Sequence, residues 1–453
     1  MTMALDHNTI LESRLMLDSL CIYRNLLKDP VIRGYQTLLK CVSESFSNSS
    51  GASDFINHYT DFYSSLVTFS NHTNFSRYII EKIIYDENSF TSRAAAGSLP
   101  ETAVMNDLKA LQKIAALSSL DIKATYMKSA KVDALHEAVI NRLPDWNALI
   151  LEAGTASCTP LESSAAIIQT LTDSKDWGRC YEALKSFHET QGCGGFAHYK
   201  AFLWHRSNGK GTIAPVRNPD PVRLTDLIGY EMERSEVIRN TEQFLDGHSA
   251  NNVLLYGDRG TGKSSTVKAI LNEYYSRGLR VIEVPKNLLV DFSEIVSDLS
   301  RRNHKFIVFV DDLAFEDREE NYTALKAVLE GSLEIKPGNV LIYATSNRRH
   351  LIKEKFSDRA GLQYGDRDDE VRAYDTMQEK LSLADRFGIT VVFSSPDKER
   401  YLHIIDELAE RNGISIARDE LHREALKWEL WYNGRSPRTA QQFIIWLKGS
   451  TGK

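Results

Sequence analysis

The stretch Val253-Leu-Leu-Tyr-Gly-Asp-Arg-Gly-Thr-Gly-Lys-Ser264 decides the fold of this 453-residue chain. It is a short apolar run that leads into the pattern G-x-x-x-x-G-K-[ST], and a helix-like segment follows it. The glycines allow the loop to curl so that its backbone N–H groups point inward, an arrangement that binds phosphate groups. If the glycine-rich turn had arisen by chance, a strand before it and a helix after it would not be expected. The stretch therefore predicts a nucleoside triphosphate site.

The residues of this loop have separate expected roles. We expect Lys263 to reach the β- and γ-phosphates, and the Ser264 hydroxyl to hold a magnesium ion, Mg²⁺. We expect the other loop residues to surround the phosphates, mainly through their backbone N–H groups. These residues are Gly257, Asp258, Arg259, Gly260, Thr261, Gly262 and Ser265.

The composition narrows the class of protein. No apolar run approaches the roughly 18–20 residues that a membrane span needs, so we expect no membrane partner. The five cysteines are scattered without C-x-x-C spacing, and the first residues lack the pattern of a secretory signal. Both features predict a cytoplasmic protein with reduced thiols. The net charge of -6 argues against a protein that coats nucleic acid, although it leaves room for a local basic groove.

Hydrophobic spacing divides the chain into three regions. Residues 1–213 carry apolar residues at helical spacing and predict a mostly helical N-terminal domain, whose partner or regulatory role is unknown. A linker rich in proline and polar residues follows, and residues 214–395 then alternate between strand-like and helix-like segments. Residues 396–453 are helix-like again and predict a small C-terminal unit.

The middle region predicts five buried strands with helices between them. The expected helices are Lys263–Arg277, Phe292–Arg301 and Asn321–Leu333. The expected strands are Asn252–Tyr256, Arg280–Val284, Phe306–Asp311, Asn339–Ala344 and Ile389–Phe393. Apolar strands separated by helices predict an α/β fold, with a five-stranded parallel sheet covered on both faces.

Two of these strands end in polar residues that suit a nucleotide site. The third strand runs into Asp311 and Asp312, and we expect Asp311 to hold the metal, directly or through water. Asp312 is then placed to orient or deprotonate the attacking water. The fourth strand leads to Asn347, whose amide can contact the γ-phosphate or that water. Acids and asparagine also end strands in solvent, and the upstream phosphate loop favours the functional interpretation.

These motifs, with Leu383-Ala-Asp-Arg-Phe387 and Gly434-Arg-Ser-Pro-Arg-Thr-Ala440, resemble the AAA+ ATPases. The resemblance covers about Arg223 to Lys448. It implies an AAA+ P-loop NTPase core with a C-terminal helical lid, and ATP with Mg²⁺ as its ligands. A narrower resemblance is to the bacterial ATPases catalogued as domain of unknown function 815. It rests on Asn251–Ser265, Asp311–Glu316, Tyr343–His350 and Leu383–Phe387.

The resemblance also implies roles for residues outside the loop. Asn347 is implied to be the first sensor, and Arg386 the arginine finger that enters the nucleotide site of a neighbouring subunit. A homo-oligomer, as a ring or a ring-like assembly, is implied with it. Arg438 is implied to be the second sensor, with Arg435 as a weaker candidate. Ile228, in the segment before the first strand, is implied to pack beside adenine.

One residue departs from the AAA+ pattern. Many members carry glutamate where this chain has Asp312, which is one methylene shorter. The shorter carboxylate predicts slow hydrolysis, unless Glu316 assists it. A slowly turning switch is therefore favoured over a fast motor.

Three hypotheses for the biological task stay open. A protein unfoldase is disfavoured, because Pro285–Phe292 lacks an aromatic–hydrophobic–glycine loop and Phe292 suits the start of the next helix. A nucleic-acid-associated loader or remodeller is weakly favoured by the basic stretch Arg301–Lys305, which a charged helix end also explains. A regulatory switch that binds a partner protein is the third. For it, the lid tryptophans are either a docking surface or lid core: Trp428, Trp431 and Trp446.

Overall fold

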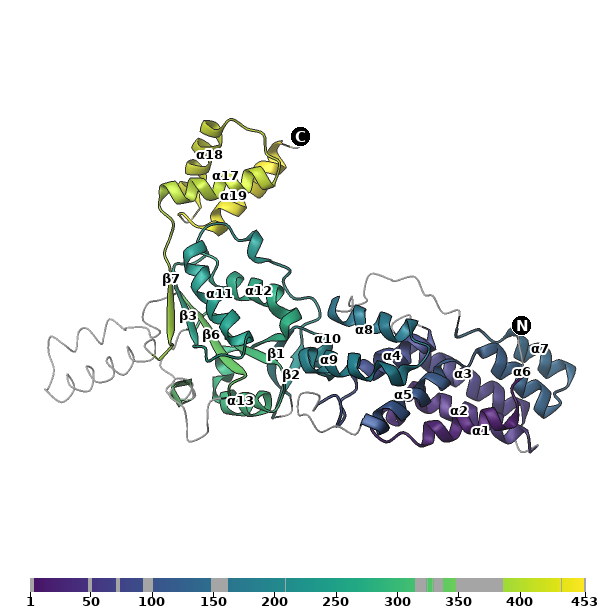
Figure 1. Ribbon diagram of the computed structural model, residues 1–453. Coiled ribbons are helices and arrows are strands. Elements are labelled where there is room, and N and C mark those ends of the chain that lie inside the picture. Colours follow the sequence, from purple (N-terminus) through teal and green to yellow (C-terminus); the bar gives the residue numbers. More distant parts are fainter. Residues whose placement is uncertain are drawn as a thin grey trace. The chain divides into compact units, whose positions relative to one another are not determined.

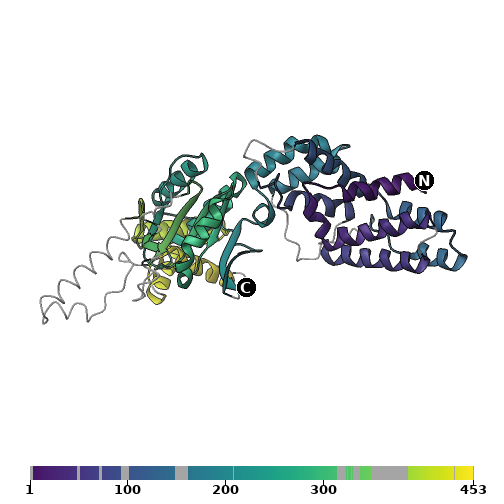
Figure 2. The same cartoon turned by 90° about the horizontal axis from the view of Figure 1, so that it is seen from below.

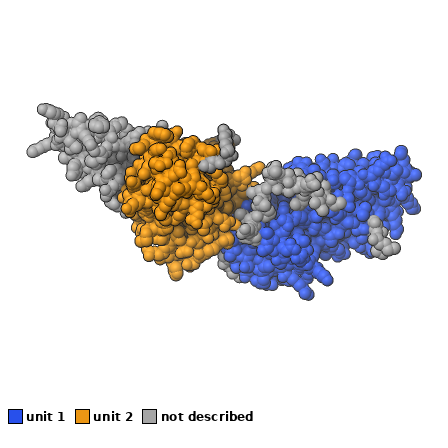
Figure 3. Space-filling view, turned by 90° about the horizontal axis from the view of Figure 1, so that it is seen from above, with its two compact units in different colours: residues 1–198 blue, residues 199–453 orange. Residues whose placement is uncertain are grey.

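The computed structural model describes residues 4–47, 51–70, 74–92, 101–147, 162–207, 209–313, 323, 325–327, 329, 337–347, 386–432 and 434–451. The chain divides into two units, residues 1–198 and 199–453 (Figure 3). The boundary that we expected between residues 213 and 214 lies within the second of these units. Among the described helices, none combines the length and the apolar character that a membrane crossing requires.

The first unit is helical, as the spacing of its apolar residues predicts. Figures 1 and 2 show its first three α-helices running side by side. Its α-helices are α1 (His7–Asp18), α2 (Pro30–Ser45), α3 (Ala52–Phe69), α4 (Phe75–Tyr85), α5 (Glu101–Ala115), α6 (Ser119–Ala130), α7 (Ala134–Arg142), α8 (Glu162–Asp173), α9 (Tyr181–Gln191) and α10 (Gly194–His198). The described part of the unit also includes the short 3-10 helices η1 (Arg24–Lys28) and η3 (Trp177–Cys180).

The first unit has a hydrophobic core of its own. Tyr35, Phe62, Phe75 and Trp146 pack together in it, and the ring centroids of Tyr35 and Phe75 are 4.4 Å apart. The residues of this core cluster all lie within the first unit. A separate core of this kind is what allows a region to fold as a domain.

The second unit contains a seven-stranded sheet in the order β2-β1-β4-β5-β6-β3-β7. Its strands are β1 (Ala201–Ser207), β2 (Lys210–Pro215), β3 (Val253–Gly257), β4 (Leu279–Glu283), β5 (Lys305–Val310), β6 (Val340–Ser346) and β7 (Ile389–Phe393). The five predicted strands correspond to β3–β7, and they pair in parallel. The predicted total of five is wrong, because the antiparallel pair β1–β2 extends the sheet beside β4.

The additional hairpin has physical causes that the sequence shows in part. In β1, Phe202 and Trp204 are buried while Leu203 between them is exposed, which is the alternation of a half-buried strand. The Trp204 indole N–H and the Arg206 Nε–H both donate to Asp291, each over 2.9 Å, and so tie the hairpin to the segment that follows β4. An Asn-Gly pair follows β1 in the sequence, and this pair is a strong hairpin signal.

Helices cover both faces of the sheet (Figure 1). Helices α11 (Glu231–Leu245) and α12 (Lys263–Tyr274) pack on one face, where Val237 and Ile270 share a core with strand residues. Helix α13 (Phe292–Ser300) packs against β6. Three 3-10 helices join these elements: η4 (Leu224–Asp226), η5 (Tyr275–Arg277) and η6 (Lys286–Asp291). The helix predicted for Asn321–Leu333 falls mostly outside the described residues.

Three C-terminal helices form the lid: α17 (Lys398–Arg411), α18 (Arg418–Trp431) and α19 (Pro437–Thr451). They enclose a small core that also includes Ile228. Trp428 packs in this region against Trp446, with ring centroids 5.2 Å apart. Trp431, in contrast, is 73% exposed. Trp446 is also exposed, at 47%, so the lid-core alternative fits Trp428 and neither Trp431 nor Trp446.

Candidate functional site

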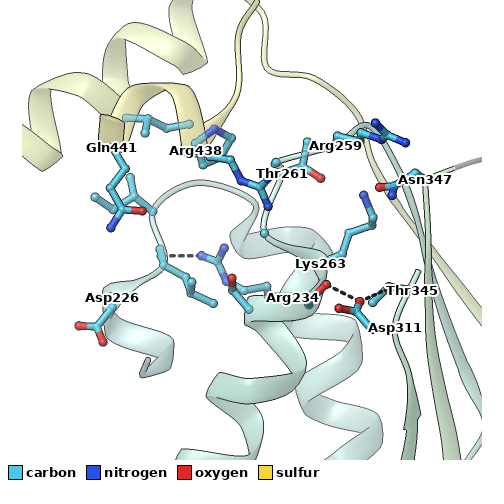
Figure 4. A pocket seen from close by; sticks show the side chains of 18 of the residues that line it. Asp226, Arg234, Arg259, Thr261, Lys263, Asp311, Thr345, Asn347, Arg438 and Gln441 are labelled. Carbon is cyan, nitrogen blue, oxygen red and sulfur yellow. Dashed lines mark hydrogen bonds between the residues drawn. The ribbon is translucent and has the colours of Figure 1, made fainter. Parts of the chain in front are cut away.

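A cavity of about 490 Å³ lies between the phosphate loop, the carboxyl ends of β5 and β6, and the lid helices (Figure 4). Parallel strands bring their carboxyl ends to one edge of a sheet, and this edge is where α/β proteins bind ligands. The residues that line the cavity are Asp226, Leu227, Ile228, Arg234, Arg259, Gly260, Thr261, Gly262, Lys263, Ser264, Ser265, Asp311, Asp312, Thr345, Asn347, Ile404, Leu408, Pro437, Arg438 and Gln441.

The start of the phosphate loop is fixed to the end of β7. Gly257 has a φ of +137°, and a Cβ atom at this position would lie 2.1 Å from the Phe393 carbonyl oxygen, so only glycine fits. The Asp258 N–H donates to that same carbonyl over 2.9 Å. The Asp258 carboxylate accepts from the Ser395 N–H over 2.7 Å, and hydrogen bonding by Ser395 lowers the pKa of Asp258. Gly257 and Asp258 therefore anchor the loop rather than line the cavity.

Lys263 is the first residue of α12, where the helix N-terminus favours negative charge. Its ammonium group donates to the carbonyl oxygens of Gly257 (3.0 Å) and Asp258 (2.6 Å), which holds it across the loop. Burial lowers its pKa to about 8, although the negative charges of Asp258, Asp311 and Asp312 oppose this shift. The lysine is thus a poorly solvated cation whose hydrogen bonds to the described residues go to two carbonyl oxygens, so an incoming phosphate group would gain a strong charge-assisted contact.

Asp311 is joined to the phosphate loop by side-chain hydrogen bonds. The Ser264 hydroxyl donates to Asp311 Oδ1 over 2.6 Å, and the Thr345 hydroxyl donates to the same atom over 2.5 Å. Carboxylate and hydroxyl oxygens are the ligands that Mg²⁺ prefers. Among the described residues, no group of three or more histidine, cysteine and acidic side chains forms a metal cluster. This donor set fits a cation that completes its coordination with phosphate oxygens and water.

Asp312 is held in an unusual backbone conformation beside Asp311. Its φ is +51°, in the left-handed region that few non-glycine residues adopt. Its N–H donates to Thr345 Oγ1 over 2.9 Å, and its carboxylate accepts from the Asn347 side-chain amide over 2.6 Å. Such conformations cluster at functional sites, because the surroundings must stabilise them. The structure therefore brings Asp311, Asp312 and Asn347 together, as the sequence predicts.

Thr345 is the polar residue that the sequence analysis missed at this end of the cavity. Strand β6 lies between β3 and β5, so Thr345 pairs with Leu255 on one side and reaches Asp311 on the other. Its hydroxyl contacts both Asp311 and the Asp312 backbone. The sequence did contain a signal for Thr345, because it is a polar residue at the end of the same strand that leads to Asn347.

The two candidates for a second sensor have different surroundings. Arg438 lines the cavity, and its backbone N–H donates to the Gly260 carbonyl over 3.2 Å. Arg435 does not line the cavity and forms an ion pair with Glu429 over 2.8 Å. The geometry therefore favours Arg438 for contact with a ligand.

Arg386 precedes the amino end of β7, whereas the phosphate loop follows the carboxyl end of the neighbouring strand β3. Gly257 pairs with Phe393 at the end of β7, whereas Val253 pairs with Ile389 at its beginning. These two pairs are roughly 13 Å apart along the strand, and Arg386 precedes Ile389 by three more residues. Arg386 is half-buried and does not line the cavity of its own chain. Glu316 lies outside the described residues.

The other end of the cavity is apolar. Ile228 lines it as expected, together with Ile404 and Leu408 of the lid. Arg234 holds the adjoining segment in place by donating to the carbonyl oxygens of Leu227 (2.9 Å) and Gly229. Sequence analysis missed the lid residues, because nothing in their spacing shows that they meet Ile228.

Comparison with known proteins identifies the family. The sequence profile described as "Protein of unknown function (DUF815)" matches residues 197–451, which is more than half of the chain. The chain belongs to this family. The matched region begins just before β1, so the missed hairpin is part of the DUF815 region. The second unit of this DUF815 protein has the AAA+ fold, with the phosphate loop after β3, the acidic end of β5 and the helical lid.

A more distant similarity is to one curated protein. The DUF815 chain is 24% identical over 168 residues to proteasome-activating nucleotidase 1 of Haloferax volcanii, and the match covers 32% of this chain and 41% of the nucleotidase. The chain therefore spans less than half the length of that relative.

Two solved structures show weaker similarity still. The Thermotoga maritima RuvB Holliday junction branch migration motor is 16% identical with a TM-score of 0.35, over 51% of this chain and 65% of that chain. The FIGL-1 AAA domain in complex with ADP is 16% identical with a TM-score of 0.32, over 50% of this chain and 73% of that chain. These identities are too low to transfer the activity of any of the three proteins.

Proposed function

We propose that this DUF815 protein binds ATP with Mg²⁺ and hydrolyses it to drive a conformational switch. The observation that carries the proposal is the hydrogen-bonded group of Ser264, Asp311 and Thr345, which stands beside the buried cation of Lys263 in one cavity. Phosphoryl transfer needs little covalent chemistry from the protein and depends on positioning and electrostatic stabilisation. This cavity supplies both.

The residues of the cavity divide this work. The backbone of the loop and Lys263 bind the phosphate groups, and Ser264 and Asp311 hold the metal ion. When bound, Mg²⁺ would neutralise charge on the phosphate oxygens. Asp312 orients the attacking water and accepts its proton, while Asn347 fixes the position of the Asp312 carboxylate over 2.6 Å. Because Asp312 is a short side chain whose carboxylate is already engaged by Asn347, we expect slow turnover.

The lid supplies the mechanical part of the proposal. The beginning of α19 rests directly on the phosphate loop, since the Arg438 N–H donates to the Gly260 carbonyl. A phosphate group that is bound by both the loop and the Arg438 guanidinium would draw α19 toward the loop. Release of the phosphate group would let α19 move back. The expected result is a lid whose position depends on the nucleotide.

The test of the proposed function is direct. Titration calorimetry of the full chain with ATP and Mg²⁺ should show saturable binding, and release of inorganic phosphate should follow at saturating ATP. Chelation of Mg²⁺ should abolish phosphate release. A chain that binds no ATP, or that releases phosphate equally well without divalent cations, would contradict the proposal.

We also propose that the active form is a homo-oligomer in which Arg386 acts on a neighbouring chain. Support for this comes from its position, because Arg386 precedes β7 at the amino end of the strand and does not line the cavity of its own chain. The Arg386→Ala variant should bind ATP normally, and its turnover should fall by about 1,000-fold. Mixing it with Lys263→Ala should restore part of the activity. Arg277→Ala, which removes an exposed ion pair with Asp246, should have little effect.

In that mixture, each inactive variant still supplies the part that the other lacks. A Lys263→Ala chain retains its arginine finger, and an Arg386→Ala chain retains its phosphate loop. If the mixtures showed no more activity than the sum of the separate variants, the finger between subunits would be refuted.

The structure supports the other hypotheses less. In the basic stretch Arg301–Lys305, Arg302 pairs with Asp298 over 3.5 Å, His304 is buried, and Lys305 donates to a backbone carbonyl over 3.1 Å. Few of its charges are therefore available to nucleic acid. The unfoldase hypothesis also weakens, because Phe292 is fully buried at the start of α13. A protein partner for the N-terminal helices remains a proposal without a defined surface.

A further inference from the structure

Gln441, an amide side chain that is exposed to solvent, lines the apolar end of the cavity, and its hydrogen-bonding groups have no partner among the described residues. We propose that Gln441 determines the nucleotide specificity of the site by pairing with the N6 amino group and the N7 atom of adenine. This inference rests on the proposed ATP function and names the residue that reads the base.

The position of Gln441 is fixed by the start of α19. The contact between the Arg438 N–H and the Gly260 carbonyl sets this helix on the phosphate loop. Gln441 follows Arg438 by three residues and therefore lies on the same helix face. Figure 4 shows Arg438 beside Thr261, whereas Gln441 points into the hollow on the side of Asp226. One helix thus presents a guanidinium near the phosphate loop and an amide farther along the same cavity.

The surroundings of Gln441 suit a flat aromatic base. Ile228 comes from the segment before α11, and Ile404 and Leu408 come from α17, so aliphatic side chains line this end from two elements. Ligand sites of this kind combine apolar walls with a small number of polar groups that set orientation. A purine between these side chains would need a polar partner at its edge.

The other polar side chains at this end are already engaged. Arg234 donates to the backbone of its own segment and pairs with Glu231 over 3.2 Å. The Asp226 carboxylate accepts from the Arg223 N–H over 2.8 Å, and Figure 4 shows it turned away from Lys263. Each of these groups also offers only donors or only acceptors. The Gln441 amide offers both a donor group and an acceptor group.

The amide matches adenine better than guanine. Adenine presents a donor at N6 beside an acceptor at N7, and a glutamine amide can satisfy both at once. Guanine presents two acceptors, O6 and N7, so the same amide leaves one of them unpaired. The pairing therefore predicts a preference for ATP over GTP.

A double-mutant cycle between protein and ligand tests the pairing. The full chain and its Gln441→Ala variant are titrated by calorimetry with ATP and with 7-deaza-ATP, which lacks the N7 acceptor, in the presence of Mg²⁺. The wild-type chain should bind 7-deaza-ATP about tenfold more weakly than ATP. Gln441→Ala should lose about tenfold in ATP affinity and should no longer distinguish the two ligands by more than about twofold. GTP should bind the wild-type chain at least about tenfold more weakly than ATP, and Gln441→Ala should narrow this ratio.

The matched control is Gln442→Ala, because Gln442 is exposed like Gln441 and lies beside it on the same helix, but does not line the cavity. It should behave as the wild type with each nucleotide. If Gln441→Ala weakened ATP and 7-deaza-ATP equally, or weakened neither, the inference would be overturned while the ATP function stood. If the wild-type chain bound no nucleotide, the proposed function itself would fail.

Discussion

The two ends of the cavity are built in different ways. The phosphate end is assembled from strand ends within one sheet, and short hydrogen bonds tie Ser264 and Thr345 to Asp311. The base end is assembled from the segment before α11 and from lid helices far along the chain, which meet through apolar contacts such as that of Ile228 with the lid core. The phosphate end is therefore held by hydrogen bonds among charged and polar groups, whereas the base end depends on the position of the lid. Nucleotide charge should be sensed at one end, and nucleotide identity at the other.

The largest expected effect is at the phosphate end. Lys263→Ala removes the buried cation, and ATP affinity should fall by at least about 100-fold, as happens when one partner of a buried charged contact is truncated. Calorimetry measures the loss. Lys268→Ala is the matched control, because Lys268 lies on the same helix, half-exposed, in an ion pair with Asp220 over 3.3 Å. Equal binding by Lys263→Ala and Lys268→Ala would show that the phosphate end is misassigned.

The pH dependence of ATP binding tests the charge at the phosphate end of the cavity. Burial lowers the pKa of Lys263 to about 8, so in the free protein this lysine loses its charge as the pH rises through 8. Because the triphosphate binds the charged form, ATP affinity should fall by up to about tenfold for each pH unit above 8 and change little just below it. Lys263→Arg keeps its charge over this range and should remove the dependence. A flat profile in the wild-type chain would contradict the assigned charge.

A smaller effect is expected where the lid meets the loop. Gly260 has a φ of +77°, and an added Cβ would lie 3.0 Å from Ser436 Oγ at the start of the lid helix α19. Gly209 has a φ of +78° with nothing within 4 Å of such an atom, so it is a control for backbone strain alone. Both alanine variants should lose about 1 kcal/mol of stability in thermal unfolding. Only Gly260→Ala should also weaken ATP binding, by a few-fold; equal binding by both variants would show that the lid contact is unimportant.

The phosphate end could be predicted from the sequence because its signals are local. The loop pattern, the paired acids after β5 and Asn347 after β6 each follow an apolar strand, and parallel strands bring such ends together. The base end could not be predicted in the same way. The meeting of Ile228 with Ile404 depends on how the lid packs, and the spacing of neither residue reveals it.

The fold too was predictable where its signals are local and not where they depend on long-range contacts. The alternation of apolar strands and helices predicted β3–β7, and all five strands are present. The β1–β2 hairpin was missed because its exposed positions and its Asn-Gly pair resemble a polar linker, while the contact of Trp204 with Asp291 is long-range. The sequence alone also left Arg435 and Arg438 as alternatives, and the ion pair of Arg435 with Glu429 separates them.

The most direct test of the account is the turnover of Asp312→Asn at saturating ATP. Asparagine adopts the left-handed conformation at this position more readily than most residues, so the φ of +51° should survive the substitution. ATP should still bind within about twofold of wild type, and phosphate release should fall by about 100-fold or more, because the base for the attacking water is lost. Phosphate release at the wild-type rate with intact ATP binding would contradict the central claim that this cavity is a hydrolytic site.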